Sequence, residues 1–95
     1  MKKKDDLGAL LAEQNQVEKA LACYDCALAL LPDQPFIWIN RASLLNTLGR
    51  YADAVASCDR SIAVDADLAA AWINRSNALN DLGRHEEALV SADRA

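Results

Sequence analysis

The chain has 95 residues, of which 53% are hydrophobic and 25% charged, and its formal net charge is −4. This length suits one globular domain, and no apolar run approaches the roughly 18 residues that a membrane-spanning helix needs. Nucleic-acid-binding proteins concentrate basic residues to neutralise phosphates, so the acidic balance argues against a nucleic-acid partner.

Residues 1–34 are expected to form the first of three similar helical units. The chain is rich in alanine and has only three glycines and two prolines, a composition that favours helix. The basic start at residues 1–6 lacks the apolar segment of a secretory signal, so secretion is not expected. At an offset of 34 residues, this unit shares with the next one Leu10, Leu11, Ala20, Ala22, Asp25, Ala29 and Asp33.

The three cysteines are expected to be reduced, which favours a cytoplasmic location, because an odd count does not form a disulfide framework. Cys23 and Cys26 form a Cys-x-x-Cys pair, which elsewhere marks a redox centre or half of a zinc site. Here the pair lies in mid-helix beside Asp25, and the only other Cys and His residues are Cys58 and His85. We therefore expect inert thiols, with no metal and no cofactor.

Residues 35–68 are predicted to form two helices joined by a very short turn. Pro35 suits a first helical turn and Gly49 suits a helix end, so the helices are expected at 35–48 and 51–64. Two such helices fold back as an antiparallel hairpin. Their apolar stripes have helical spacing and consist of Trp38, Ala42 and Leu45 in the first helix and Tyr51, Ala54, Val55, Cys58 and Ile62 in the second.

Residues 69–95 repeat the preceding unit closely. Residues 35–61 and 69–95 have 13 identities in 27 aligned positions. The shared residues include Trp38 with Trp72, Arg41 with Arg75, Gly49 with Gly83, Ser57 with Ser91, and Asp59 with Asp93. A second hairpin is therefore predicted here.

Small residues recur where each hairpin is expected to be tightest. They are Gly8, Ala42 and Ser76 in the first helices and Ala20, Ala54 and Ala88 in the second helices. Such residues let two helix backbones approach to the short end of the usual spacing of about 8 to 10 Å.

A unit of 34 residues with a Trp, a small residue four positions on, a Leu-Gly turn, an aromatic residue and an Ala resembles the tetratricopeptide repeat (TPR). The resemblance covers the whole chain. It implies an all-α superhelix, or solenoid, of three helix-turn-helix repeats and six helices within one TPR domain. The repeats are 1–34, 35–68 and 69–95, the last incomplete. The first unit departs most, with Lys4 at the Trp position and Asn15 at the Gly position.

The resemblance also implies a protein–protein interaction scaffold that holds a peptide or a helix on its concave face. The polar positions expected there are Asn40, Ser43, Asn46, Asn74, Asn77 and Asn80, and the apolar anchors beside them are Phe36, Ile39 and Ile73. An amide side chain donates and accepts hydrogen bonds, so such a ladder can pair with a peptide backbone. Solvation of a helix surface is the competing interpretation of the same residues.

Some TPR proteins clamp a chaperone's C-terminal carboxylate with Lys, Arg and Asn side chains. The corresponding residues here are Asp5, Ala9, Asn40, Ala70 and Asn74, of which only Asn40 matches. The cations that would neutralise the carboxylate are absent from these positions. This specialised binding function is therefore not expected.

No pairing of a nucleophile with a base is evident, so an enzyme is not expected. His85 takes the place of Tyr51 in the repeat and is expected to be a packing residue. The third hairpin is expected to expose Ala78, Leu82, Leu89 and Ala92. This face suggests either a segment of a longer repeat protein or self-assembly as a homodimer or end-to-end stack through the C-terminal repeat. A further alternative function is a non-catalytic regulatory segment of a larger enzyme.

Overall fold

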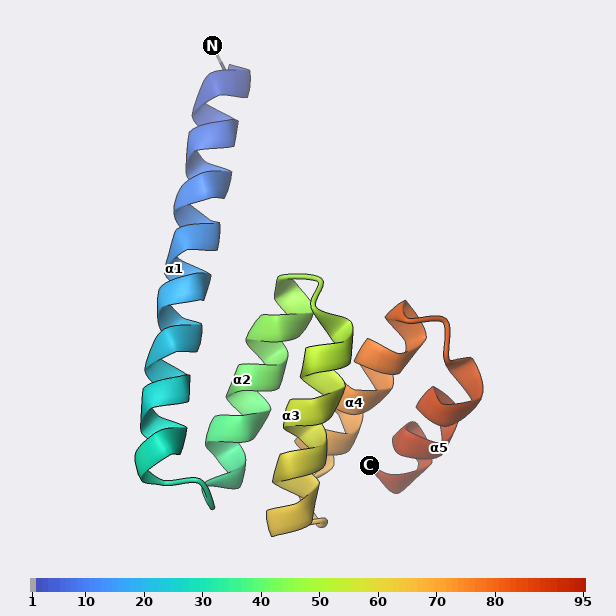
Figure 1. Cartoon of the computed structure of the whole chain (residues 1–95). Coiled ribbons are helices and arrows are strands. Elements are labelled where there is room, and N and C mark those ends of the chain that lie inside the picture. The colour runs from blue at the N-terminus through green and yellow to red at the C-terminus, as the bar shows by residue number, and fades with distance from the viewer. Residues whose placement is uncertain (1) are drawn as a thin grey trace.

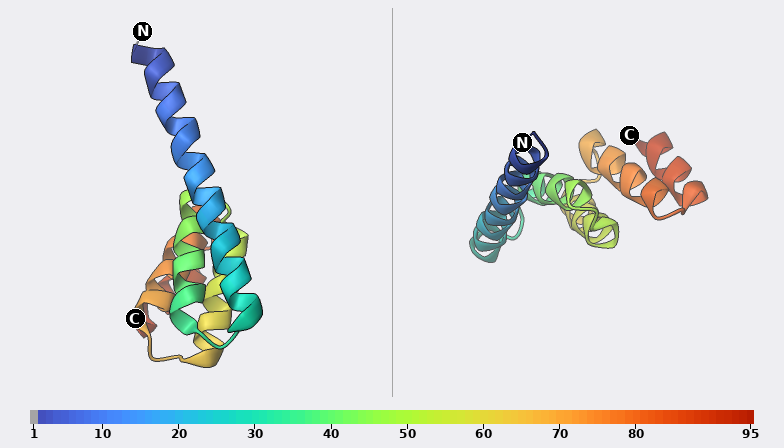
Figure 2. Two further views of the ribbon diagram at one scale, coloured as in Figure 1. Left: turned by 90° about the vertical axis from the view of Figure 1, so that its left-hand side faces the viewer. Right: turned by 90° about the horizontal axis from the view of Figure 1, so that it is seen from above.

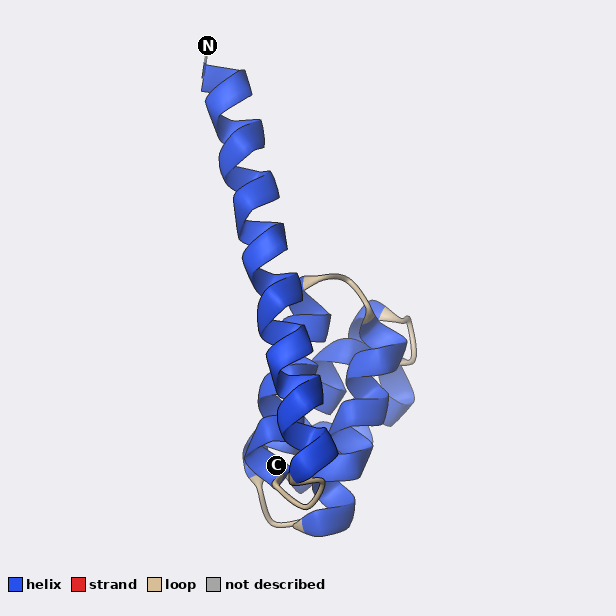
Figure 3. Cartoon of the chain, turned by 60° about the vertical axis from the view of Figure 1, so that its left-hand side comes forward, coloured by secondary structure: helices blue, strands red, loops and turns tan. Residues whose placement is uncertain are grey.

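Helices account for all the regular secondary structure in the part of the chain that the structure describes (Figure 3). The computed structural model describes the backbone of residues 2–95 and the side chains of residue 13 and residues 15–95. The helices are α1 (Lys2–Leu30), α2 (Pro35–Thr47), α3 (Tyr51–Val64), α4 (Ala69–Asp81) and α5 (His85–Arg94). The predicted all-α class is confirmed.

Two antiparallel hairpins, α2 with α3 and α4 with α5, form the regular part of the fold. Their short turns contain Gly49 and Gly83, whose φ angles are +76° and +80°. A Cβ atom at either position would meet nothing within 4 Å, so the backbone conformation, and not lack of space, requires glycine there. The helix ends predicted for 35–48 and 51–64 agree with α2 and α3 to within one residue.

The first unit differs from the hairpin that its alignment predicts. Residues 2–95 form five helices where six were expected, because α1 is continuous from Lys2 to Leu30. Asn15 occupies the repeat position of Gly49 and Gly83, and residues 9–31 contain neither glycine nor proline. Nothing in this segment therefore breaks the helix. The predicted tight packing at Gly8 lies outside the residues whose side chains are described.

The helices follow one another in a row, as the view from above shows (Figure 2, right). Each helix from α2 onward packs on the next, and α2 also contacts α4. Within the described residues, α1 contacts α2 alone. The radius of gyration is 14.7 Å, against about 12 Å for a compact domain of this length. The first part of α1 extends well past the other helices (Figure 1; Figure 2, left).

The core consists mainly of the apolar stripes that face each other inside and between the hairpins. Its buried members are Leu21, Ala42, Leu45, Ala54, Val55, Cys58, Ala78, Leu79 and Ala88. Both stripes predicted for the second unit thus contribute to the core, and Tyr51 packs against it, whereas Trp38 and Ile62 are half-buried.

Replacing Ala54 by leucine is expected to lower the free energy of unfolding by about 1 to 3 kcal/mol, because Ala54 is fully buried and the extra side chain overpacks the hairpin. Ala52→Leu is the matched control, since Ala52 lies on the exposed side of α3. Thermal melts compare the two variants with the parent chain. An unchanged melting temperature for Ala54→Leu contradicts the tight packing.

Arginine side chains tie successive repeats together in the same way twice. Arg41 of α2 donates from Nε to Asp25 Oδ1 of α1 at 2.6 Å and from a terminal guanidinium nitrogen to Ser57 Oγ of α3 at 2.5 Å. Arg75 of α4 makes the equivalent bonds to Asp59 of α3 at 2.8 Å and to Ser91 of α5 at 2.6 Å. Each guanidinium thus joins three helices, and we call these two arrangements the arginine clamps.

The two tryptophans fix the loops between repeats. The indole Nε1 of Trp38 donates to the carbonyl oxygen of Pro32 at 2.8 Å, and that of Trp72 to Ala66 at 2.7 Å. The guanidinium carbons of Arg60 and Arg94 lie 5.1 Å from the centres of the Trp38 and Trp72 rings, respectively, close enough for cation–π attraction. Both indoles are thus occupied in holding the fold.

Candidate functional site

A polar hollow lies where α2 and α4, the first helices of the two hairpins, run beside each other. Its volume is about 460 Å³. Its lining residues are Ser43, Asn46, Thr47, Asn74, Asn77, Asn80 and Asp81. Five of the six polar residues predicted for the concave face therefore line one hollow, which we call the amide hollow.

Hydrogen bonds hold part of this lining in place and leave part of it free. Asn46 donates from Nδ2 to the carbonyl oxygen of Asn74 at 3.3 Å, which links the two repeats. Asn46 Oδ1 is buried and has no hydrogen-bond partner. An unpaired buried acceptor is costly, so the bond from Asn46 Nδ2 to Asn74 is the one hydrogen bond that holds this amide in place.

The charge of the amide hollow comes from Asp81 alone. Its other lining residues carry hydroxyl or amide groups, and no Lys or Arg is among them. Asn80, the neighbour of Asp81 on α4, has its Oδ1 3.1 Å from Nδ1 of His85. The hollow therefore favours neutral or cationic groups over carboxylates.

The remaining predicted binding residues occupy different places. Asn40 is exposed on α2 but does not line the hollow. Phe36 and Ile73 are 62% and 49% exposed, so both side chains are accessible to a partner. Ile39 is only 6% exposed, which places it in the interior and removes it as a surface anchor.

The positions that correspond to a carboxylate clamp supply no cation among the described side chains. Asn40 and Ala70 are exposed, and Asn74 is half-buried with its carbonyl oxygen bonded to Asn46. Asp5 and Ala9 lie outside the residues whose side chains are described.

The cysteines and the possible metal ligands do not gather in one place among the described residues. Cys23 and Cys26 are exposed on α1, whereas Cys58 is buried. Burial, with a smaller contribution from the negative charge of Asp59, raises the pKa of the Cys58 thiol to about 12. Across the described residues, no three metal-ligating side chains come together.

His85 is exposed, so its predicted packing role is wrong. It begins α5, which contacts only α4, whereas Tyr51 begins α3, which packs against both α2 and α4. The imidazole therefore lacks a second helix to pack on and instead lies beside Asn80.

The predicted apolar face of the last hairpin is present with one change. Leu82, Leu89 and Ala92 are exposed, and Leu89 has 65% of its surface accessible. Ala78 is fully buried because it packs in the core cluster with residues of α2 and α3, so its predicted exposure is wrong. Val90 is also exposed and was not predicted.

No helix in the described part of the chain combines the length and the apolar character needed to cross a bilayer.

Two family models described as tetratricopeptide repeat match the chain, one at residues 6–68 and the other at residues 66–94. Similar solved structures include the first and second TPR of Spaghetti (RPAP3), each bound to the HSP90 peptide SRMEEVD, both with a TM-score of 0.82. The first is 27% identical and the second 25%, with coverage of 94% of this chain in each case and of 71% and 82% of those chains.

The Arabidopsis OM64 TPR domain is also similar, with 25% identity, a TM-score of 0.79, and coverage of 88% of this chain and 69% of that one. No curated protein sequence matches the chain.

Proposed function

The chain belongs to the tetratricopeptide-repeat family, and from this premise we propose that it is a protein-interaction module whose amide hollow holds an extended segment of a partner protein. The family membership and the peptide-bound neighbours support an interaction scaffold with no catalysis of its own. The observation that carries the proposal is the convergence of Ser43, Asn46, Asn74, Asn77 and Asn80 on one hollow.

Hydrogen bonds in the amide hollow would fix the position of the bound segment but would supply only part of the affinity. Each one contributes about 0.5 to 1.5 kcal/mol net, so two amides add at most about 3 kcal/mol. Even a millimolar complex needs about 4.1 kcal/mol. Apolar contacts must provide the rest, and full burial of an aromatic side chain contributes about 1.5 to 3 kcal/mol. Phe36 and Ile73 are the exposed side chains on α2 and α4 that suit this role.

The partner segment proposed here is neutral or basic. The peptide SRMEEVD, which the two Spaghetti domains hold, carries three acidic side chains. In this chain the hollow offers no cation to such a peptide, and Asp81 would repel it. Asp81 would instead favour a Lys or Arg of the partner close to its carboxylate.

A peptide titration followed by NMR tests this function. Three ten-residue extended peptides serve as probes, one neutral, one with two lysines and one ending in SRMEEVD. We expect the lysine peptide to bind most tightly and to shift the side-chain amide signals of Asn46, Asn74 and Asn77. The double variant Ser43→Ala with Asn77→Ala is expected to weaken that binding by about 5- to 100-fold, because two hydrogen bonds are lost.

Asn40→Ala is the matched control, since Asn40 lies on α2 but does not line the hollow. We expect it to keep the affinity within about twofold. If the double variant binds as tightly as the parent, or if the acidic peptide binds most tightly, the proposed use of the hollow is wrong.

End-to-end stacking through the last repeat is a second candidate function. It is supported by exposed Leu89 and Val90 and by Asp93, which has the repeat position of Asp25 and Asp59. In the arginine clamps, each of these aspartates pairs with an arginine of the following hairpin. Asp93 has no ion-pair partner among the described residues and could accept an arginine from another unit.

A further inference from the structure

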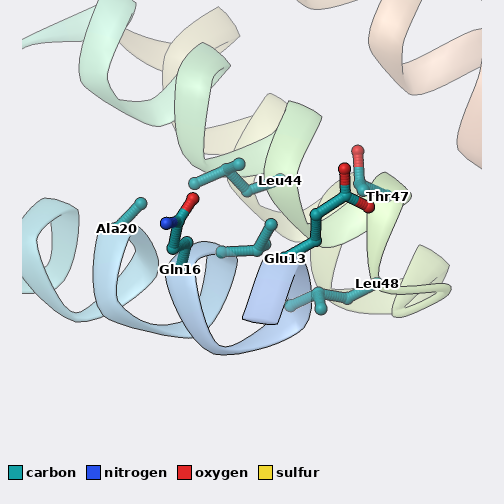
Figure 4. Close-up of a pocket in the computed structure, with 7 residues that line it drawn as sticks. Glu13, Gln16, Ala20, Leu44, Thr47 and Leu48 are labelled. Carbon is teal, nitrogen blue, oxygen red and sulfur yellow. The ribbon is translucent and has the colours of Figure 1, made fainter. Parts of the chain in front are cut away.

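An apolar hollow lies between α1 and the end of α2. Its volume is about 440 Å³. The residues around it are Glu13, Gln16, Val17, Ala20, Leu44, Thr47 and Leu48 (Figure 4). The close-up shows Ala20 and Leu44 directed toward the same space from the two helices (Figure 4). We call this hollow the α1–α2 seat.

The repeat shows what belongs in the seat. At an offset of 34 residues, Ala20 and Leu44 correspond to Ala54 and Ala78. Ala54 and Ala78 are fully buried in the cluster that contains Leu45 of α2. Ala20 and Leu44 are only half-buried. One repeat later, the place equivalent to the seat lies between α3 and α4. It is filled by α2, the first helix of the hairpin that α3 completes.

The segment that corresponds to that first helix is residues 2–14. In this chain it continues α1 in a straight line past the other helices and does not turn back (Figure 1; Figure 2, left). Folding back would need a turn at residues 14–16, where the other units have glycine at φ angles near +76° and +80°. Asn15 occupies that position, and a left-handed conformation is costlier for Asn than for Gly.

We propose that the seat is filled by residues 2–14 of a second copy of this chain, in a reciprocal exchange that makes a homodimer. In a hairpin the first helix runs antiparallel to the second, as α2 does to α3. Two α1 helices lying antiparallel and centred near residue 15 would therefore place each N-terminal segment in the seat of the other copy. Such an arrangement has two-fold symmetry and closes on itself, as exchange of identical elements requires.

Residues 2–14 of a second copy, placed in the seat, would account for two features of the structure. It covers Ala20 and Leu44 with the segment whose sequence aligns with α2, including Leu10 and Leu11 opposite Leu44 and Leu45 in the alignment. It also keeps α1 continuous through Asn15, with its backbone hydrogen bonds intact. The exchange uses the N-terminal unit and is independent of the C-terminal face formed by Leu89 and Val90.

Light scattering after gel filtration tests the exchange across a range of protein concentrations. The parent chain, of 10.3 kDa, is expected to approach twice that mass. Asn15→Gly restores the turn residue of the other two units, so it is expected to favour the closed hairpin and raise the dimer dissociation constant at least about tenfold. Ala22→Gly is the matched control, because residue 22 is helical in both forms, and it should leave the dissociation constant within about twofold.

A second variant and a second measurement keep the result interpretable. Leu89→Asp disrupts any stacking through the last repeat and should leave the exchanged dimer unchanged. In a mixture of isotope-labelled and unlabelled chains, methyl groups of Val17, Leu44 and Leu48 should show intermolecular NOEs to residues 2–14. A parent chain that is monomeric at every concentration, a dimer abolished by Leu89→Asp, or NOEs confined to one chain would each overturn the proposal.

Discussion

Leu45→Ala is expected to lower the free energy of unfolding by about 2 to 5 kcal/mol, measured by urea denaturation followed by circular dichroism. Leu45 is fully buried in the core cluster, which has members from all five described helices. Removing its side chain leaves a cavity at the contact between two repeats. The loss is a large share of the about 5 to 15 kcal/mol that stabilises a typical domain.

Two comparisons make this result specific. Leu79→Ala should have a similar effect, because Leu79 has the same repeat position and is also fully buried. Leu30→Ala removes the same atoms from a side chain that is 82% exposed, and it should change stability by less than about 0.5 kcal/mol. Equal losses for Leu45 and Leu30 would contradict the packing described above.

Cys58 is expected to resist alkylation by iodoacetamide about a thousandfold more strongly in the native chain than in the unfolded chain at pH 8. The thiolate is the reactive form, and burial raises the pKa of this thiol from the ordinary value of 9.0 to about 12. A pKa that is higher by about three lowers the fraction of thiolate at pH 8 by about a thousandfold. Mass spectrometry of native and urea-treated samples measures the difference, with exposed Cys23 and Cys26 as internal controls.

The same shift predicts a loss of stability in alkali. Because the folded pKa is raised above the unfolded value, the stabilisation is fully present below about pH 9 and is lost as the pH rises toward 12. The slope in this window is about 1.4 kcal/mol per pH unit. Subtracting the pH profile of Cys58→Ala from that of the parent isolates this contribution. Identical profiles would show that the thiol does not ionise with the raised pKa.

Most of the fold was predictable because the signals that determine it are local. Pro35 and Gly49 mark the ends of α2, and the spacing of Trp38, Ala42 and Leu45 identifies its inner face. The repeat then extends these boundaries to α4 and α5. The first unit was predicted less well because an alignment records which residues are shared, whereas the missing turn depends on one residue that is not shared, Asn15.

The candidate site was predictable in part for a related reason. Ser43 and Asn46 are three residues apart on α2, and Asn74, Asn77 and Asn80 repeat that spacing on α4, so each set lies on one helix face. The two faces together line the amide hollow, and their position on a concave, peptide-binding side stays a prediction. Ile39 is adjacent to Asn40 in sequence, but one step along a helix turns the side chain by about 100° and into the interior.

The arginine clamps were not predicted, although their residues are visible in the repeat. Asp25, Arg41 and Ser57 are separated by 16 residues, as are Asp59, Arg75 and Ser91. A spacing of 16 residues has no meaning within a single helix. It brings side chains together only when three successive helices stack, so the contact follows from tertiary geometry that helix periodicity does not contain.

The arginine clamps also affect how the domain unfolds. Each guanidinium belongs to one hairpin but holds a carboxylate of the preceding unit, so opening either hairpin alone leaves a half-buried charge without its partner. In an array of repeats, this is a nearest-neighbour coupling term of the kind that sets cooperativity. Such a term penalises partly melted states relative to both the fully folded and the fully melted chain. The module should therefore unfold in a single cooperative transition.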